Sequence, residues 1–367
     1  MNASKRTAIL ALSDGTIFRG KAFGAPARTT GELVFFTSPT GYQEVLSDPG
    51  ASGQIVVFAY PELGNVGVSD GSRESDRIHA AGVVARHLAE APSSHLAEAS
   101  LESHLEEAGI PGIEGIDTRK LVRILRDGGS QWAVLSTEEG VIPEAMVAEA
   151  QALAEAPRAE GAGEVGCKTP YEVDAAGPQR FHVVAYDFGI KRSMIRHLTE
   201  RGCKLTVVPA STPASQALAH EPDGIFLSSG PGRPDRAEEA TATVREFLGK
   251  APIFGICFGH QLLAQAAGGS TLRMSRGHHG SNHPVKDLAT GRVAITAQAH
   301  RYTVDPKSLE RAGAELTHVS LHDGGVEGFA LPAARAFGVQ FHPEAGPGPH
   351  DSLALFDRFT QLMEVAR

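Results

Sequence analysis

Residues 252–267 read PIFGICFGHQLLAQAA and place one cysteine between two glycines. The apolar run before the cysteine predicts a buried strand, and the run after it predicts a helix. A G-x-C-x-G turn between a strand and a helix has the form of a nucleophile elbow, with sulfur in place of oxygen. The helix N-terminus favours a thiolate and can hold an oxyanion. Cys257 is therefore predicted to be a nucleophile, and the alternative is a buried cysteine in a glycine-rich turn.

Strand-like and helix-like segments alternate around this turn. Predicted strands cover 181–186, 205–208 and 224–228, and predicted helices cover 190–198 and 237–248. Such alternation is typical of an open, mostly parallel sheet with helices on both faces. Ligands of such sheets lie beyond the carboxyl ends of the strands, which is where Cys257 stands. We predict an α/β domain over residues 181–367.

The N-terminal part of the chain is strand-rich and is predicted to form a mixed α+β domain over residues 1–142. Strands are expected at 8–12, 33–36, 55–60, 83–85 and 132–135, and a helix at 117–126. A further helix is expected from Pro143 to Pro157, and residues 158–180 are rich in Ala, Gly, Pro and Glu. Residues 143–180 are thus predicted to be a helix and a linker.

Composition limits the class of protein. The 367 residues suggest two domains, and the formal net charge of −9 argues against a broad nucleic-acid or anionic-membrane surface. The odd count of three cysteines excludes a disulfide framework; Cys167 is expected at the surface of the linker and Cys203 in strand packing. No signal-peptide core and no apolar run of about 18 residues is present, so a cytoplasmic location is predicted.

The segment 339–344, VQFHPE, supplies a base and a carboxylate for the predicted nucleophile. Pro343 favours an extended conformation of His342, and residues two apart in an extended segment point the same way. Glu344 can then orient the imidazole of His342, which gives a Cys-His-Glu triad in chain order. A surface turn is the alternative for this segment. His260, inside the predicted helix, is interpreted as structural.

Two further segments carry polar groups that bear on the site. Residues 228–234, SSGPGRP, expose backbone N–H groups that suit an oxyanion hole together with the amide of Phe258. An ordinary Gly-Pro turn is the alternative. His278, His279 and His283 have no carboxylate or cysteine at ligand spacing. They are expected in a polar loop, and no metal site is predicted.

Three motifs together resemble the class I (triad) glutamine amidotransferase family: GICFGHQ at 255–261, SSGPGRP at 228–234 and FHPE at 341–344. The N-terminal half resembles the small-subunit domain of carbamoyl-phosphate synthetase, and its motifs are specific to this one amidotransferase. Those motifs are FFTSPTGYQEVLSDP at 35–49, YPELGNVG at 60–67 and GIDTRKL at 115–121. The resemblance covers nearly the whole chain.

The resemblance implies a glutaminase. Cys257 would attack the carboxamide carbon of glutamine, and His342, oriented by Glu344, would protonate the departing ammonia and then activate water. Backbone amides of Gly230 and Phe258 would hold the oxyanion. The positions that match glutamine-binding residues of the family are Ser38, Gly232, Gln261 and Tyr302.

The resemblance also implies a partner. Ammonia would pass through a tunnel to a separate large subunit, which makes carbamoyl phosphate from bicarbonate and two ATP for arginine and pyrimidine biosynthesis. This chain would hold no cofactor, because ATP and Mg²⁺ would bind the large subunit, and the sequence contains no GxxxxGK[ST] loop. No nucleic-acid or membrane partner is expected.

One segment departs from the family pattern. Residues 298–302 read QAHRY where the family reads Q-N-H-G-[FY]. Ala299 cannot supply the hydrogen bonds of asparagine, and Arg301 replaces a small glycine. Arg301 could either compensate by pairing with the α-carboxylate of glutamine or block the pocket. Two alternatives to the glutaminase remain. One is a different Cys-His-Glu hydrolase or the glutaminase of another synthetase. The other is a paralogue that lacks glutamine binding and acts as a scaffold or regulator of the large subunit.

Overall fold

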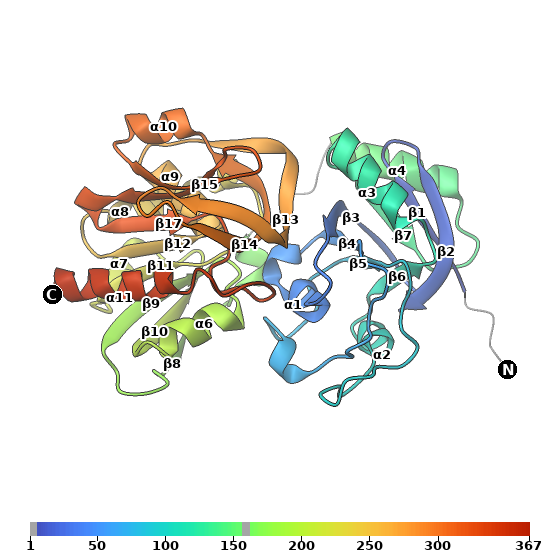
Figure 1. Ribbon diagram of the computed structural model, residues 1–367, viewed down its shortest axis with the longest axis horizontal. Helices are drawn as coiled ribbons and strands as arrows, with labels where there is room; N and C mark the ends of the chain where they lie inside the picture. Colours follow the sequence, from blue (N-terminus) through green and yellow to red (C-terminus); the bar gives the residue numbers. More distant parts are fainter. Residues whose placement is uncertain (1–5, 156–161) are drawn as a thin grey trace. The chain divides into compact units, whose positions relative to one another are not determined.

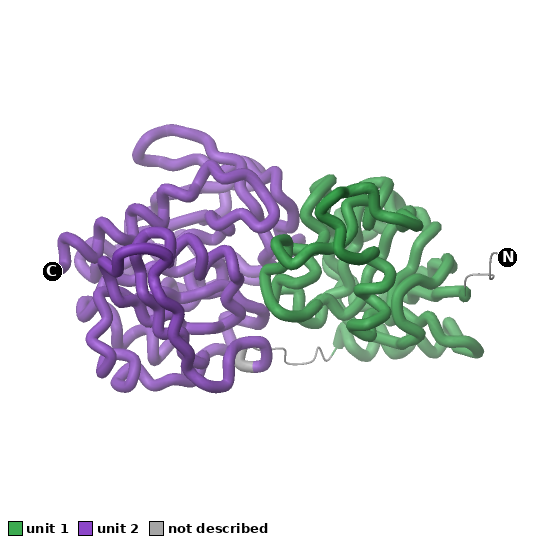
Figure 2. Tube along the Cα trace, turned by 90° about the horizontal axis from the view of Figure 1, so that it is seen from below, with its two compact units in different colours: residues 1–159 green, residues 160–367 purple. Residues whose placement is uncertain are grey.

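The computed structural model of the chain describes residues 6–155 and 162–367. They form two compact units, 1–159 and 160–367 (Figure 2). The division between the units falls within the segment predicted as a helix and linker. The expected end of that helix at Pro157 and the expected start of the linker at Arg158 lie outside the described residues.

Unit 1 contains a closed barrel with the strand order β1-β2-β6-β5-β4-β3-β7. The strands from β3 through β4 and β5 to β6 pair in parallel, and the other pairs are antiparallel. The strands are β1 (Thr7–Leu12), β2 (Ile17–Gly24), β3 (Arg28–Phe36), β4 (Gln54–Phe58), β5 (Gly82–Val84), β6 (Pro111–Glu114) and β7 (Trp132–Ser136). The helices are α1 (Tyr42–Ser47), α2 (Leu101–Glu107), α3 (Thr118–Gly128) and α4 (Pro143–Glu155).

The helix α4 packs on the barrel and is part of unit 1. Its residues Met146 and Ala150 form a buried cluster with Ile9 of β1 and Val134 of β7. These strand residues alternate with those that fill the barrel, so α4 covers the outer face. The described part of the predicted helix, Pro143–Glu155, is therefore held by the barrel.

Unit 2 contains a sheet with the strand order β14-β13-β15-β16-β17-β12-β11-β9-β10-β8 (Figure 1). Its strands are β8 (Tyr171–Val173), β9 (Phe181–Asp187), β10 (Cys203–Pro209), β11 (Gly224–Leu227), β12 (Ile253–Ile256), β13 (Thr271–Asp287), β14 (Val293–Val304), β15 (Glu315–Ser320), β16 (Val326–Leu331) and β17 (Ala336–Val339). From β10 through β9, β11 and β12 to β17 the pairing is parallel, which confirms the predicted parallel sheet at its centre.

Antiparallel strands extend this sheet on the side of β17. The strand β13, paired with β14, contains His278, His279 and His283, so the expectation of a polar loop there is wrong. The pairing of β13 with β14 is interrupted by two register shifts. A strand with such shifts lacks the regular apolar-polar alternation that identifies a strand in sequence.

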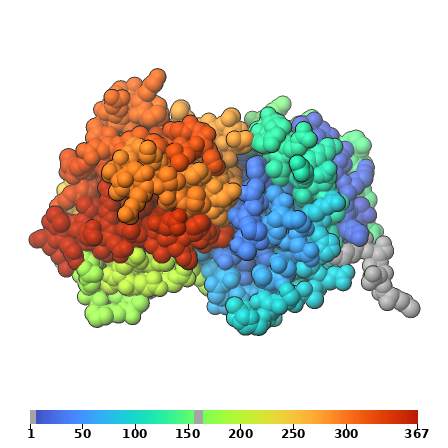
Figure 3. Space-filling view, viewed as in Figure 1, coloured from blue at the N-terminus to red at the C-terminus, as the bar shows by residue number. Residues whose placement is uncertain are grey.

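Helices cover both faces of the sheet (Figure 1). On one face α7, α8 and α9 contribute to one buried apolar cluster, and on the other α6 and α11 contribute to a second. The helices of unit 2 are α5 (Ala162–Val165), α6 (Arg192–Thr199), α7 (Ala214–Leu218), α8 (Glu238–Phe247), α9 (Phe258–Ala266), α10 (Pro306–Arg311) and α11 (Ala354–Ala366). The C-terminal segment that holds α11 lies at the surface of unit 2 (Figure 3, red). Within residues 6–155 and 162–367, no helix is long and apolar enough to cross a membrane.

The two cysteines outside the elbow differ from each other. Cys203 is fully buried at the start of β10, as its predicted packing role requires. Cys167 is half-buried and packs against the core of unit 2, and its amide donates a 2.8 Å hydrogen bond to Asp187 Oδ2. Burial and then Asp187 raise the pKa of the Cys167 thiol to about 12. The predicted surface thiol of a linker is therefore a part of unit 2, and β8 follows it in the same sheet.

Candidate active site

The predicted nucleophile elbow lies between β12 and α9. Cys257 adopts φ 53° and ψ −101°, a conformation that non-glycine residues rarely adopt and that stores backbone strain. A Cβ built at Gly255 would lie 2.7 Å from the carbonyl oxygen of Gly259, and one built at Gly259 would overlap the carbonyl oxygen of Leu227. The two glycines are therefore required by close backbone approaches, as the sequence pattern predicts.

The thiol of Cys257 faces two neighbouring segments. The Cys257 amide donates to the carbonyl oxygen of Val339 at 2.9 Å, which joins the elbow to the end of β17. Its Sγ lies 3.9 Å from the carbonyl oxygen of Ala299 on β14 and 3.6 Å from Nε2 of Gln340. The thiol is thus enclosed by β14 and the segment that follows β17, and Cys257 is only 5% exposed.

His342 and Glu344 follow β17 and form the predicted pair. Nδ1 of His342 lies 2.7 Å from Oε1 of Glu344, and both side chains are buried. A carboxylate can only accept, so Nδ1 donates and Nε2 is left for the nucleophile. Among the described residues Nε2 has no hydrogen-bond partner. The two neighbouring parallel strands β12 and β17 therefore bring the nucleophile and the base to the same edge of the sheet.

Lys191 completes this arrangement and was not among the predicted site residues. Its ammonium group donates to Oε1 of Glu344 at 3.0 Å and to the carbonyl oxygens of Ala345 and Gly346 at 3.1 and 2.8 Å. The side chain is 2% exposed. Lys191 stands at the start of α6, in the turn after β9. A lysine at the carboxyl end of a predicted strand is the sequence signal that would have found it.

These charges fix the protonation states of the pair. Burial would raise the pKa of Glu344, but Lys191 and then His342 outweigh it and hold this pKa below its usual range. Burial alone would lower the pKa of His342, because it disfavours the charged imidazolium. The Glu344 carboxylate and the nearby Cys257 raise it instead, to about 10. An imidazolium next to a thiol favours a thiolate, which is the nucleophilic form of cysteine.

The two predicted oxyanion donors lie in tight backbone turns. Phe258 is the first residue of α9, where backbone N–H groups lack partners within the helix. A Cβ at Gly230 would overlap the carbonyl oxygen of Phe188, so no other residue fits there. The hydroxyl of Ser228 accepts a 3.0 Å hydrogen bond from the Phe188 amide and donates to the Ser229 carbonyl at 2.8 Å. The loop after β11 is therefore held in place beside the turn after β9.

The predicted glutamine-binding residues divide between the two units. Gly232, with φ 120°, lies in the loop after β11, and Tyr302 lies in β14. Nε2 of Gln261, in α9, donates to the Tyr302 carbonyl and to Oε1 of Gln340, both at 2.9 Å. This leaves its Oε1 as the group that can accept from a substrate. Ser38 lies between β3 and α1 of unit 1, and its role in glutamine binding stays a prediction.

The segment 298–302, which differs from the family pattern, lies in β14. The carbonyl of Ala299 in this strand faces Cys257. The main chain of this strand also contacts the triad, because the His342 amide donates to the Ala297 carbonyl at 2.9 Å. Arg301 is partly buried in the same strand, and burial lowers its pKa. The strand that carries the residues differing from the family pattern therefore forms part of the wall of the candidate site.

The interpretation of His260 as structural agrees with its surroundings. It is fully buried in α9, with its ring 4.9 Å from the ring of Phe329, centroid to centroid. Burial lowers the pKa of His260 to about 3, so the side chain is neutral at ordinary pH. A different histidine group, His278 and His300 with Glu327, holds potential metal-ligating atoms within 4.8 Å of one another. The sequence spacing did not reveal it because each residue comes from a different strand.

Comparison with known proteins identifies the family. Residues 184–362 match glutamine amidotransferase class-I, and residues 10–135 match carbamoyl-phosphate synthase small chain, CPSase domain. The carbamoyl phosphate synthase small chain of Polynucleobacter asymbioticus is 50% identical, over 98% of this chain and 96% of its own length. That of Ralstonia nicotianae is 49% identical, over 97% of each chain. The chloroplastic small chain of Oryza sativa subsp. japonica is 44% identical, over 98% of this chain and 82% of its own. The chain belongs to the carbamoyl phosphate synthase small chain family and carries a class-I glutamine amidotransferase domain.

Proposed function

We propose that this chain hydrolyses L-glutamine with a Cys257-His342-Glu344 triad and supplies the ammonia to carbamoyl phosphate synthesis. The observation that carries the proposal is the strained elbow at Cys257 beside a histidine bound to a buried carboxylate at 2.7 Å. A nucleophile, a base and a group that orients the base are the parts that covalent acyl transfer needs.

The first half of the reaction releases ammonia. Sγ of Cys257 attacks the carboxamide carbon of glutamine beside the His342 imidazolium, whose Nε2 holds the proton for the leaving group. Backbone amides of Gly230 and Phe258 donate to the oxyanion of the tetrahedral intermediate. His342 then protonates the amine, the C–N bond breaks, and a γ-glutamyl thioester and ammonia remain.

The second half regenerates the enzyme. His342 takes a proton from water, whose oxygen forms a bond with the thioester carbon. The C–S bond then breaks and glutamate leaves, and the Cys257 thiolate again faces the protonated His342. Glu344, itself paired with Lys191, stabilises the imidazolium in both halves.

Glutamine is held by groups around the thiol. Gly232, Tyr302 and Oε1 of Gln261 are the binding groups that unit 2 offers, and Ser38 of unit 1 is a further one by family resemblance. We assign the α-carboxylate of glutamine to Arg301, a cationic side chain in β14, two residues from Ala299, whose carbonyl faces Cys257. This pairing compensates for the hydrogen bonds that Ala299 cannot make.

The ammonia passes to a carbamoyl phosphate synthase large subunit, which uses bicarbonate and two ATP. The product serves arginine and pyrimidine biosynthesis, and the compartment we predict is the cytoplasm. ATP and Mg²⁺ bind the large subunit in this proposal, and no cofactor takes part in the hydrolysis of glutamine. Support comes from relatives named small chain over nearly the full length of this chain.

Glutamine hydrolysis by wild type and Cys257→Ser, each with and without the cognate large subunit, tests the proposal. We expect turnover by the wild type that rises in the complex and is lost in the variant, because serine is a much weaker nucleophile than a thiolate in this setting. Ammonia-dependent carbamoyl phosphate synthesis by the variant complex is the control for assembly. Complex formation by the wild type without any glutamine turnover would contradict the proposal.

A further inference from the structure

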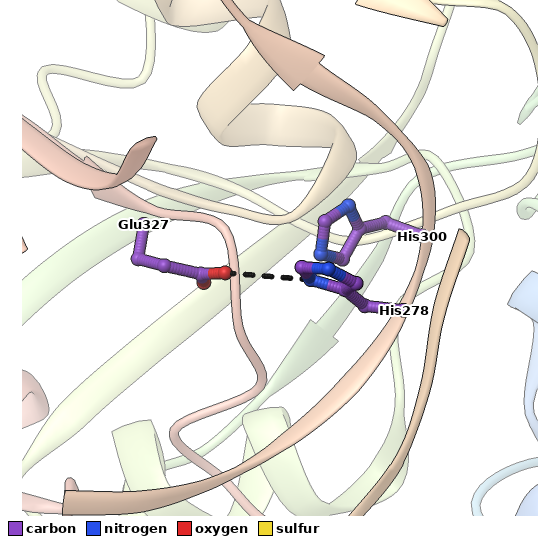
Figure 4. Close-up of side chains that lie close together, drawn as sticks. All are labelled: His278, His300 and Glu327. Carbon is purple, nitrogen blue, oxygen red and sulfur yellow. Dashed lines mark ion pairs between the residues drawn. The ribbon is translucent and has the colours of Figure 1, made fainter. Parts of the chain in front are cut away.

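Three buried side chains converge beside the candidate active site, on strands that the sequence separates widely. They are His278 of β13, His300 of β14 and Glu327 of β16 (Figure 4). Their exposed fractions are 7%, 5% and 1%, and one potential ligand atom of each lies within 4.8 Å of the others. None of them is a member of the triad or binds glutamine in the proposed function.

Each of the two histidines has one ring nitrogen held by a neighbour and the other directed into the cluster. Nε2 of His278 lies 3.0 Å from Oδ2 of Asp323, and Nδ1 of His300 lies 2.8 Å from the carbonyl oxygen of Tyr302. Because carboxylate and carbonyl oxygens only accept, these nitrogens donate. Nδ1 of His278 and Nε2 of His300 have no hydrogen-bond partner among the described residues. Both side chains therefore direct one ring nitrogen into the buried cluster, where Nδ1 of His278 faces Glu327 in an ion pair.

The carboxylate is oriented in a similar way. Oε2 of Glu327 accepts a 2.8 Å hydrogen bond from Nε2 of Gln298. Oε1 lies 3.7 Å from Nδ1 of His278, which is longer than a hydrogen bond (Figure 4). Two ligands about 2.1 Å from a tetrahedral ion are roughly 3.4 Å apart, so this separation suits a shared metal. Each of the three side chains thus has one end held by a neighbour outside the cluster, and its other end faces the cluster.

We propose that His278, His300 and Glu327 bind a divalent first-row transition-metal ion, with Zn²⁺ the ion that fits best. Two imidazoles and one carboxylate are a ligand set that Zn²⁺ prefers, and a fourth position is left for water. Histidine ligands that donate their other N–H to a carboxylate or a carbonyl are typical of real metal sites.

The site would hold β14 in place. This strand carries Ala299, whose carbonyl oxygen lies 3.9 Å from Cys257 Sγ, and Ala297, which bonds to the His342 amide. The Tyr302 carbonyl that accepts from His300 also accepts from Gln261. An ion that ties β14 to β13 and β16 therefore fixes a wall of the active site without touching the substrate.

Zinc binding by the full chain in a Cys257→Ser background tests the proposal, since that change removes the active-site thiolate as a competing ligand. After treatment with a chelator, we expect calorimetric titration to show one equivalent of Zn²⁺ bound and the Tm to rise with added zinc. Glu327→Gln keeps the shape of the side chain and is expected to weaken binding at least about tenfold. Co²⁺ is expected to bind the same site, with absorption bands of a four-coordinate ion that Glu327→Gln removes.

A surface histidine provides the matched control. His322 is exposed, with its ring 4.9 Å from that of His283, centroid to centroid, and His322→Asn is expected to leave zinc binding unchanged. His300→Asn is the second ligand variant, and the far-UV circular dichroism of each variant checks its folding. The proposal is overturned if the Cys257→Ser protein binds no equivalent of Zn²⁺, or if the two ligand variants bind it as tightly as the control.

Discussion

The ammonium group of Lys191 is buried, and the desolvation of a buried charge is unfavourable. Its partner Glu344 is 1% exposed, and the same Oε1 atom that accepts from Lys191 also accepts from His342. Taking two charges out of water costs several kcal/mol for each ion, and their attraction offsets that cost only when the pair is intact. Lys191 therefore acts on the proposed reaction through Glu344 and the imidazole that Glu344 orients.

Lys191→Met is expected to lower the free energy of unfolding by about 3–5 kcal/mol, because it leaves the buried Glu344 carboxylate without its cation. Urea unfolding measures the change. Lys204→Met is the matched control: Nζ of Lys204 lies 2.9 Å from Glu172, but that pair is at the surface, so little or no loss of stability is expected. Equal losses in the two variants would mean that the burial of the Lys191 pair has no energetic consequence.

The pH dependence of stability reports on His342. Burial alone would lower its pKa, but Glu344 and Cys257 raise it from 6.5 to about 10. A raised pKa contributes stability that is complete below pH 6.5 and is lost as the pH rises through about 10. Glu344→Gln removes the carboxylate that raises the pKa of His342 most. We expect the stability gap between wild type and this variant, from urea unfolding, to narrow as the pH rises through that window; a gap that widens would contradict the assigned charge state.

At the scale of elements, the β12-turn-α9 unit is the part that sequence alone predicts best. Its strand, glycines and helix are local in the chain, and the structure has them where the motif requires. The barrel strands β2 and β6 were missed because Ile17–Gly24 has no regular alternation and Pro111–Glu114 is very short. Lys191 and the His278 cluster were missed for another reason. They depend on which strands become neighbours, and a single sequence does not show strand order.

At the elbow we expect a substitution to destabilise the protein although helix propensity alone would favour it. Gly259 is in α9, where alanine would otherwise stabilise a helix by about 1 kcal/mol. Its Cβ would overlap the Leu227 carbonyl of β11, so Gly259→Ala is expected to destabilise the chain by about 1–3 kcal/mol and to abolish glutamine hydrolysis. Gly177→Ala is the control, because its Cβ would meet no atom within 4 Å. Thermal unfolding compares the two, and a Gly259→Ala protein as stable as wild type would contradict this packing.

At the scale of the whole molecule, the two units carry different kinds of information. The elbow, His342 and Glu344 all belong to unit 2, and a fold with these parts is compatible with many glutaminases. The barrel of unit 1 contains the motifs at 35–49 and 60–67 that resemble one amidotransferase, and it matches the small chain family over residues 10–135. The chemistry is thus predicted from one unit and the pathway from the other.

Carbamoyl phosphate synthesis by the complex with the large subunit separates glutamine binding from the later steps. Arg301→Gly is expected to raise the KM for glutamine about tenfold to a hundredfold, since a hydrogen bond to a charged group contributes about 1.5–3 kcal/mol. The KM for ammonia in the same complex is expected to stay unchanged, because free ammonia bypasses glutamine hydrolysis. Arg276→Gly removes an exposed arginine from β13 and is the control for loss of a positive charge. An unchanged or lower KM for glutamine in Arg301→Gly would show that Arg301 does not bind the α-carboxylate, and a rise in both KM values would place its effect outside the glutamine site.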